Sequence, residues 1–189
     1  RCALLVVMAL AFSRPFFRQN TVTGLDPSFG TRVVLLIDSR ASMQRDGFWE
    51  KVLCEARSAL DQVQPADSLA ILTFSDQTQA HLRFDQWRDL PEPNRLPAAR
   101  ETLNGLQPGW GRTHLGNAII TAAEILEENT HAGPQRIIVL TDRQEGAQLD
   151  GLSGRDWPAN LQVTLNTLTP AAPGNAGLHR APPNRSENS

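Results

Sequence analysis

Runs of apolar residues that each end at a polar or turn segment recur along the middle of the chain. Three of these runs are nearly continuous: Val33–Asp38, Leu69–Phe74 and Ile137–Thr141. Such runs are typical of parallel strands that helices cover on both faces. Leu161–Leu168 alternates between apolar and polar residues, which predicts a strand nearer the edge of a sheet. His81–Phe84, after a turn near Ser75–Gln77, predicts a short antiparallel edge strand.

Other segments carry their apolar residues at the helical period of three or four. The first such stripe contains Trp49, Val52, Leu53, Ala56, Leu60 and Val63. The second contains Leu115, Ala118, Ile119, Ala122, Ala123 and Leu126. A shorter helix is expected over Leu96–Leu106, after the proline-rich stretch that begins at Leu90. Alternation of strands and helices predicts an α/β fold: a doubly wound, mostly parallel sheet with helices on both faces.

The two ends of the chain differ from this middle part. Cys2–Phe12 is an apolar run of eleven residues, whereas a membrane-spanning helix needs about 20. It can be the end of a transmembrane helix, a signal-peptide core or a short buried helix. We favour the transmembrane helix, because Arg14 and Arg18 flank its exit as interfacial anchors would. From Pro170 onward, the chain is rich in Pro, Gly, Asn and Ser and is predicted to be a disordered linker or tail.

We therefore divide the chain into four parts: 1–18, the end of a membrane helix; 19–31, a linker; 32–169, the folded domain; and 170–189, the tail. The net charge is −2 and no basic stripe is present, so nucleic-acid binding has no electrostatic support. The two cysteines do not form a disulfide framework or a zinc motif. We expect Cys54 to be a small core residue.

Polar residues gather where the predicted strands end. Asp38 and Asp142 follow two strands, and Thr113 precedes a predicted helix at the same edge of the sheet. Ligands bind at this edge in doubly wound sheets, and Mg²⁺ prefers carboxylate and hydroxyl oxygens. Each residue also has an ordinary structural explanation: Asp38 as a loop cap, Thr113 as a helix N-cap and Asp142 as a turn residue.

Together these residues resemble the von Willebrand factor A (VWA) domain, over roughly Arg32 to Leu168. The metal-ion-dependent adhesion site of that family reads Asp-x-Ser-x-Ser, then Thr, then Asp. The resemblance implies Asp38, Ser42, Thr113 and Asp142 as ligands of Mg²⁺, with one position left for an acidic residue of a partner. No catalytic residue and no other cofactor is implied.

Arg40 departs from this pattern, because it stands where the family has its first serine. A guanidinium has no lone pair to offer to a metal and stays protonated. We expect Arg40 to pair with the two carboxylates and to replace the metal electrostatically, so that metal binding is weak or lost. In the alternative, Arg40 points outward or toward a bound anion and the metal site survives.

Further phrases resemble a bacterial subgroup of the family, the membrane-anchored aerotolerance (Bat-type) proteins. These phrases are the Ala-rich, Arg-Pro end of the N-terminal run, Gly47–Val52, Thr141–Gly146 and Asn175–Gly177. This resemblance implies a bacterial membrane protein whose VWA domain faces the periplasm. The flanking charges do not decide the orientation.

These observations predict a non-enzymatic domain that binds a protein partner at the strand-end rim, through an acidic residue of the partner. The first alternative is a structural scaffold with an inert rim. The second is a metal-dependent hydrolase that uses Asp38 and Asp142, although no positioned base accompanies them in the sequence.

Overall fold

A computed structural model of the chain describes residues 29–45, 47–111, 114–128, 133–142 and 157–168. Five strands form one sheet in the order β3-β2-β1-β4-β5. They are β1 (Arg32–Asp38), β2 (Ser68–Phe74), β3 (Thr78–Leu82), β4 (Gln135–Thr141) and β5 (Leu161–Thr167). Neighbouring strands are parallel except β2 and β3, which are antiparallel. The predicted α/β fold with a mostly parallel sheet is therefore confirmed.

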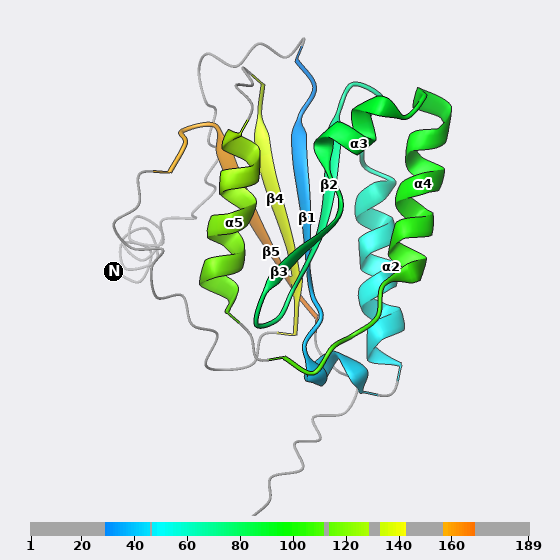
Figure 1. Ribbon diagram of the computed structural model, residues 1–189, viewed down its shortest axis with the longest axis vertical. Coiled ribbons are helices and arrows are strands. Elements are labelled where there is room, and N and C mark those ends of the chain that lie inside the picture. Colours follow the sequence, from blue (N-terminus) through cyan, green and yellow to red (C-terminus); the bar gives the residue numbers. More distant parts are fainter. Residues whose placement is uncertain (1–28, 46, 112–113, 129–132, 143–156, 169–189) are drawn as a thin grey trace, which may run out of the picture.

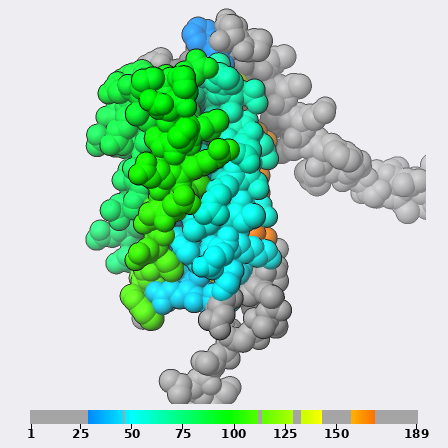
Figure 2. All heavy atoms as spheres, turned by 90° about the vertical axis from the view of Figure 1, so that its right-hand side faces the viewer, coloured from blue at the N-terminus to red at the C-terminus, as the bar shows by residue number. Residues whose placement is uncertain are grey.

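Helices cover both faces of this sheet (Figure 1). On one side lie α2 (Phe48–Leu60), α3 (Phe84–Asp89) and α4 (Glu92–Gly105), and on the other lies α5 (Leu115–Glu127). A short 3₁₀ helix, η1 (Ala41–Gln44), follows β1. Figure 2 shows the outer face that α2 and α4 form together.

Alternate residues of β1 belong to two separate hydrophobic cores. Leu35 and Ile37 pack with the buried stripe of α2 and with Leu103 of α4. Val34 and Leu36 pack with the apolar face of α5. All seven residues of β1 are buried, because the strand has a parallel neighbour on each side and helices above and below it.

Several local predictions were wrong. Phe84 begins α3 rather than ending a strand; the backbone N–H of Arg83 donates to Gln86 Oε1 at the start of that helix (2.9 Å). Helix α4 begins at Glu92, four residues earlier than predicted, because Pro93 is tolerated in a first helical turn. Cys54 is exposed and is not a core residue. It lies two positions before the buried Ala56, which places it about 200° away around α2.

Three predicted segments lie outside the described residues: the membrane helix of residues 1–18, the linker up to residue 28 and the tail after residue 168. Within the described ranges, every helix is too short or too polar to cross a membrane.

Candidate functional site

The candidate site lies where β1 and β4 end side by side. The two strands are parallel and Ile37 is paired with Leu140, so Asp38 and Thr141 meet at the carboxyl edge of the sheet. Thr141 Oγ1 donates a hydrogen bond of 2.8 Å to Asp38 Oδ2. Asp142 follows Thr141 directly, and its side chain is fully buried, like that of Asp38. The sheet register therefore brings together two carboxylates that are 104 residues apart in the sequence.

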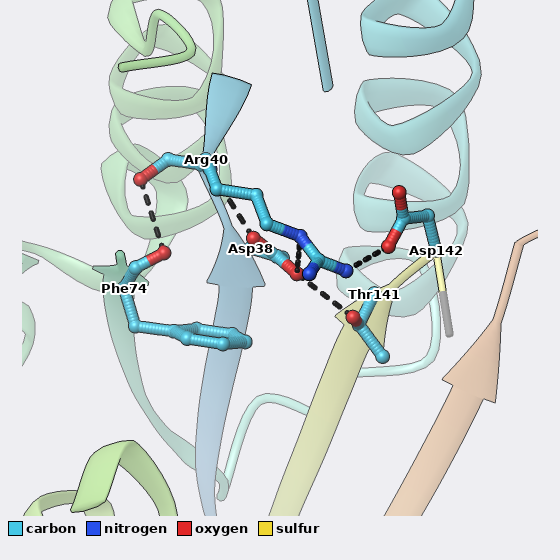
Figure 3. Close-up of polar contacts among 6 residues, drawn as sticks. Asp38, Arg40, Phe74, Thr141 and Asp142 are labelled. Atoms are coloured by element: carbon cyan, nitrogen blue, oxygen red, sulfur yellow. Dashed lines mark hydrogen bonds and ion pairs between the residues drawn. The ribbon is translucent and has the colours of Figure 1, made fainter. Parts of the chain in front are cut away.

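Arg40 lies between these two carboxylates (Figure 3). Its Nε is 3.2 Å from Asp38 Oδ2, and its Nη2 contacts Asp142 Oδ1. The backbone N–H of Arg40 also donates to Asp38 Oδ1 (3.2 Å). The side chain of Arg40 is 13% exposed, whereas those of both aspartates are 0% exposed. From solvent, the guanidinium is therefore the accessible charge of the three.

Burial is the main influence on Asp38. The pKa of this carboxyl is raised from its ordinary value of 3.8 to about 6, chiefly because the buried charged form loses its hydration. The charge of Arg40 and the hydrogen bonds from Thr141 and from the Arg40 amide oppose this rise, and the nearby Asp142 adds to it. Without Arg40, two buried carboxylates would lie close together with no counter-charge.

Two buried oxygens at the site lack a hydrogen-bond partner within the described part of the chain: Ser42 Oγ, in η1, and Asp142 Oδ2. These oxygens are of the kind that Mg²⁺ prefers. A guanidinium nevertheless lies between the two carboxylates, and a divalent ion beside it would face a like charge. With Arg40 in this position, the residues do not fit a resident divalent ion. Thr113, the remaining predicted ligand, lies outside the described residues. The N-cap position of α5 is His114.

A loop that follows α4 borders the site. The backbone N–H of Gly109 donates to the carbonyl oxygen of Ser39, which is the residue before Arg40. Gln44 Nε2, from η1, donates to the carbonyl oxygen of Gly109 (3.1 Å). The next residue, Trp110, is 84% exposed. Neither Gln44 nor Trp110 was predicted from the sequence as part of the site, although an aromatic residue between two glycines near the predicted rim was an available signal.

The profile of the von Willebrand factor type A domain matches residues 33–145, which is more than half of the chain. No curated protein sequence matches the chain at a significant level. Solved structures do resemble it. BatB from Bacteroides thetaiotaomicron is 20% identical with a TM-score of 0.56, and the match covers 72% of this chain and 65% of BatB.

An aerotolerance-related membrane protein from Bacteroides fragilis is 19% identical with a TM-score of 0.52; the match covers 80% of this chain and 77% of that protein. A von Willebrand factor type A protein from Catenulispora acidiphila is 17% identical with a TM-score of 0.56, over 72% of this chain and 32% of that chain. At these identities, the similarity establishes the fold alone. The fold and the profile match together show that this chain belongs to the von Willebrand factor type A family, with structural similarity to Bat-type aerotolerance proteins.

Proposed function

We propose that this domain is a non-enzymatic protein-interaction module whose binding rim carries Arg40 in place of a metal ion. VWA domains are commonly interaction modules and are usually non-catalytic. The observation that carries the proposal is the contact of one guanidinium with both rim carboxylates, Asp38 and Asp142. Arg40 supplies there the positive charge that a metal would otherwise supply.

Electrostatics explains why Arg40 opposes a metal at this position. The two aspartate side chains are fully buried, so their interaction with the guanidinium is weakly screened by solvent. A metal ion would have to displace the guanidinium from both carboxylates or bind beside it. Either route costs free energy, because a charge-assisted hydrogen bond to Asp142 and an ion pair with Asp38 would be lost or like charges would be brought together. Metal affinity at Asp38, Ser42, Thr113 and Asp142 is therefore weak or absent in this proposal.

The partner contributes an acidic residue to the rim. Arg40 is the accessible member of the charged group, and a carboxylate from outside would meet the guanidinium before either buried aspartate. The group as a whole has two carboxylates and one guanidinium, and hence a net charge of −1, so only direct contact with the guanidinium would favour a third carboxylate. Such binding persists in the presence of chelators and weakens as salt is added.

The proposal also includes a location at a membrane and the boundaries of the folded domain. The similar protein from Bacteroides fragilis is an aerotolerance-related membrane protein. We place the VWA-like domain at residues 32–169, tethered through residues 1–18 to a bacterial membrane, with the domain on the periplasmic side. The chain matches 65% of the length of BatB, so this architecture is a proposal for the present chain.

Calorimetric titration of the 189-residue chain with Mg²⁺ and Mn²⁺, beside the variant Arg40→Ser, tests the proposal. We expect no binding to the wild type and measurable binding to Arg40→Ser, because the substitution removes the competing charge and restores a hydroxyl oxygen. Arg100→Ser, at an exposed ion pair with Asp61, is the matched control and should gain no binding. Tight binding of either metal to the wild type would contradict the role of Arg40. Absence of metal binding in both proteins would favour the structural scaffold with an inert rim.

The alternative function, from the enzyme class, is a metal-dependent hydrolase that uses Asp38 and Asp142. Turnover of a generic phosphoester by the wild type, lost in Asp38→Ala, would support it. We expect no turnover in either protein, because a guanidinium already occupies the space between the two carboxylates.

A further inference from the structure

A cavity of about 540 Å³ lies between β2, β3, α3 and α5, at the end of the sheet where β1 begins. Figure 1 shows α3 and the start of β1 at the upper end of the domain, whereas η1, next to Arg40, is at the lower end. Arg32, the first residue of β1, lines the cavity, and Asp38 is the last residue of that strand. At the rise of a β-strand, these two residues are about 20 Å apart. A ligand of this cavity would therefore bind independently of the rim.

The floor and walls of the cavity are apolar. Ala80 of β3 is paired with Leu72 of β2, and Ala70 lies two residues earlier on β2; the two alanines leave space that larger side chains would fill. Phe84 of α3 and Ile125 of α5 also line the cavity. Ala70 and Leu72 are buried whereas Ala80 is exposed, so the cavity opens on the side of β3. At about 30 Å³ for each water molecule, the volume would accept a ligand of roughly 10–15 non-hydrogen atoms.

The charged side chains that line the cavity are three arginines, Arg32, Arg83 and Arg88, and two acids, Asp85 and Glu128. Their net charge is +1, whereas that of the whole chain is −2. Arg83 and Asp85 form an ion pair with each other, with 3.1 Å between Arg83 Nη2 and Asp85 Oδ2. The excess of positive charge therefore belongs to the two other arginines, which share the single charge of Glu128.

Arg32 and Arg88 act on each other as like charges. Burial is the main cause that lowers the pKa of Arg32; the charge of Glu128 raises this pKa, and the charge of Arg88 lowers it further. Arg32 is held in place by its hydrogen bond to the carbonyl oxygen of Leu126 (2.8 Å) and by its contact with the ring of Phe84. The guanidinium of Arg88, by contrast, has no ion pair or hydrogen bond within the described part of the chain. An anion in the cavity would reduce the repulsion and accept hydrogen bonds from Arg88.

We propose that this cavity binds an aliphatic monocarboxylate of about 8–12 carbon atoms, with its chain against the alanines of β2 and β3 and its carboxylate at Arg88. The net charge of +1 matches one negative charge, whereas a dianion would also meet the charges of Asp85 and Glu128. A guanidinium donates two parallel hydrogen bonds to a planar carboxylate, which an alcohol cannot accept in the same way.

NMR titration of the ¹⁵N-labelled 189-residue chain with octanoate tests this proposal, with 1-octanol, acetate and octyl phosphate as comparison ligands. Ala80→Phe fills the cavity from an exposed position. Gln79→Phe is the matched control, because Gln79 is also exposed and consecutive residues of a strand point to opposite faces. Arg88→Met removes the charge at the cavity, and Arg100→Met, at the exposed ion pair with Asp61, is its control. Circular dichroism verifies that each variant is folded.

We expect octanoate to shift the amide signals of β2, β3 and α3 and to bind at least about fivefold more tightly than 1-octanol or acetate. Its affinity should fall at least about tenfold in Ala80→Phe, because the aliphatic chain would have no room. The affinity should fall about fivefold in Arg88→Met, because one charged contact is lost. The two control variants should bind octanoate like the wild type.

Three kinds of result would overturn this inference. Absence of shifts, shifts confined to other parts of the chain, or an unchanged affinity in Ala80→Phe would exclude the cavity as the binding site. Equal binding of octanoate and 1-octanol, or an unchanged affinity in Arg88→Met, would exclude the role of the carboxylate. Tighter binding of octyl phosphate would exclude a monocarboxylate as the preferred ligand. None of these results would affect the proposed function at the rim.

Discussion

Arg40 follows β1 and reaches Asp142 at the end of β4, 102 residues later in the chain, and so ties the two central strands together at one edge of the sheet. The contact is almost completely buried, since the side chain of Arg40 is 13% exposed and that of Asp142 is 0% exposed. Arg40 is therefore expected to affect stability as well as recognition. The two effects can be separated by substitution.

Replacing Arg40 by Met should lower the free energy of unfolding by about 3–5 kcal/mol at pH 7, because Asp38 and Asp142 would remain buried without a counter-charge. Urea denaturation followed by circular dichroism measures this change. Arg100→Met is the control; it breaks an ion pair whose side chains are 51% and 59% exposed and should cost at most about 1 kcal/mol. Equal, small effects of the two substitutions would show that Arg40 is not the counter-charge of the buried aspartates.

Asp38 should make stability depend on pH. In the folded protein its pKa is raised to about 6, above the ordinary value of 3.8, so between these values the folded state binds more protons than the unfolded state. The contribution of Asp38 to the free energy of unfolding is therefore highest below pH 3.8 and is lost as pH rises toward 6. At about 1.4 kcal/mol for each pKa unit, the loss amounts to about 3 kcal/mol.

Denaturation of the wild type and of Asp38→Asn across this pH window tests the prediction. The difference in unfolding free energy between the two proteins should change with pH, since the other titrating groups are common to both. A difference that stays constant from pH 3.8 to pH 6 would mean that Asp38 titrates normally in the folded protein.

Gly30, just before β1, should not tolerate a side chain. A Cβ at this position would lie 1.8 Å from the carbonyl oxygen of Ala66, so the backbone would have to move in Gly30→Ala. We expect a loss of about 1–3 kcal/mol in chemical denaturation. Gly105→Ala is a matched control: it ends α4, nothing lies within 4 Å of the added Cβ, and stability should be unchanged or slightly raised. Equal effects would contradict the close approach at Gly30.

Arg32 should contribute to stability from the opposite end of β1. Its Nη1 donates to the carbonyl oxygen of Leu126 (2.8 Å) at the end of α5, and its guanidinium lies 4.1 Å from the ring centroid of Phe84. Arg32→Met removes a buried charge-assisted hydrogen bond and a cation–π contact, so we expect a loss of about 2–3 kcal/mol. Thermal denaturation beside Arg100→Met, at the exposed arginine that pairs with Asp61, provides the comparison. A loss no larger than that of the control would mean that solvent replaces these contacts.

The sequence predicts the centre of this fold better than its periphery. The apolar run Val33–Asp38 was correctly predicted as a strand, because it is too short for a buried helix and a strand covered on both faces needs no polar side. β5 was also correctly predicted at an edge, because exposure on both sides permits polar residues at Gln162 and Asn166. Helix α3 was missed, because a six-residue helix with one buried residue, Trp87, has too short a pattern to detect.

The candidate site was likewise predictable from the sequence only in part. That Asp38 and Asp142 lie at one edge follows from parallel strands, and it could be predicted. The orientation of Arg40 remained open between two alternatives, because a side chain followed by a loop can point inward or outward; in the structure it points inward. The exposure of Trp110 depends on contacts of its neighbours with Ser39, Gln44 and Asp76, which are distant in the sequence.

A cation that is part of the polypeptide differs from a bound ion in one thermodynamic respect. The occupancy of an ion site varies with the concentration of free ion, whereas Arg40 is attached two residues after Asp38 and its effective concentration is set by the chain. Depletion of divalent ions from the surroundings cannot remove it. An adhesion site of this kind would be constitutive, and its affinity would follow ionic strength and pH instead of metal supply.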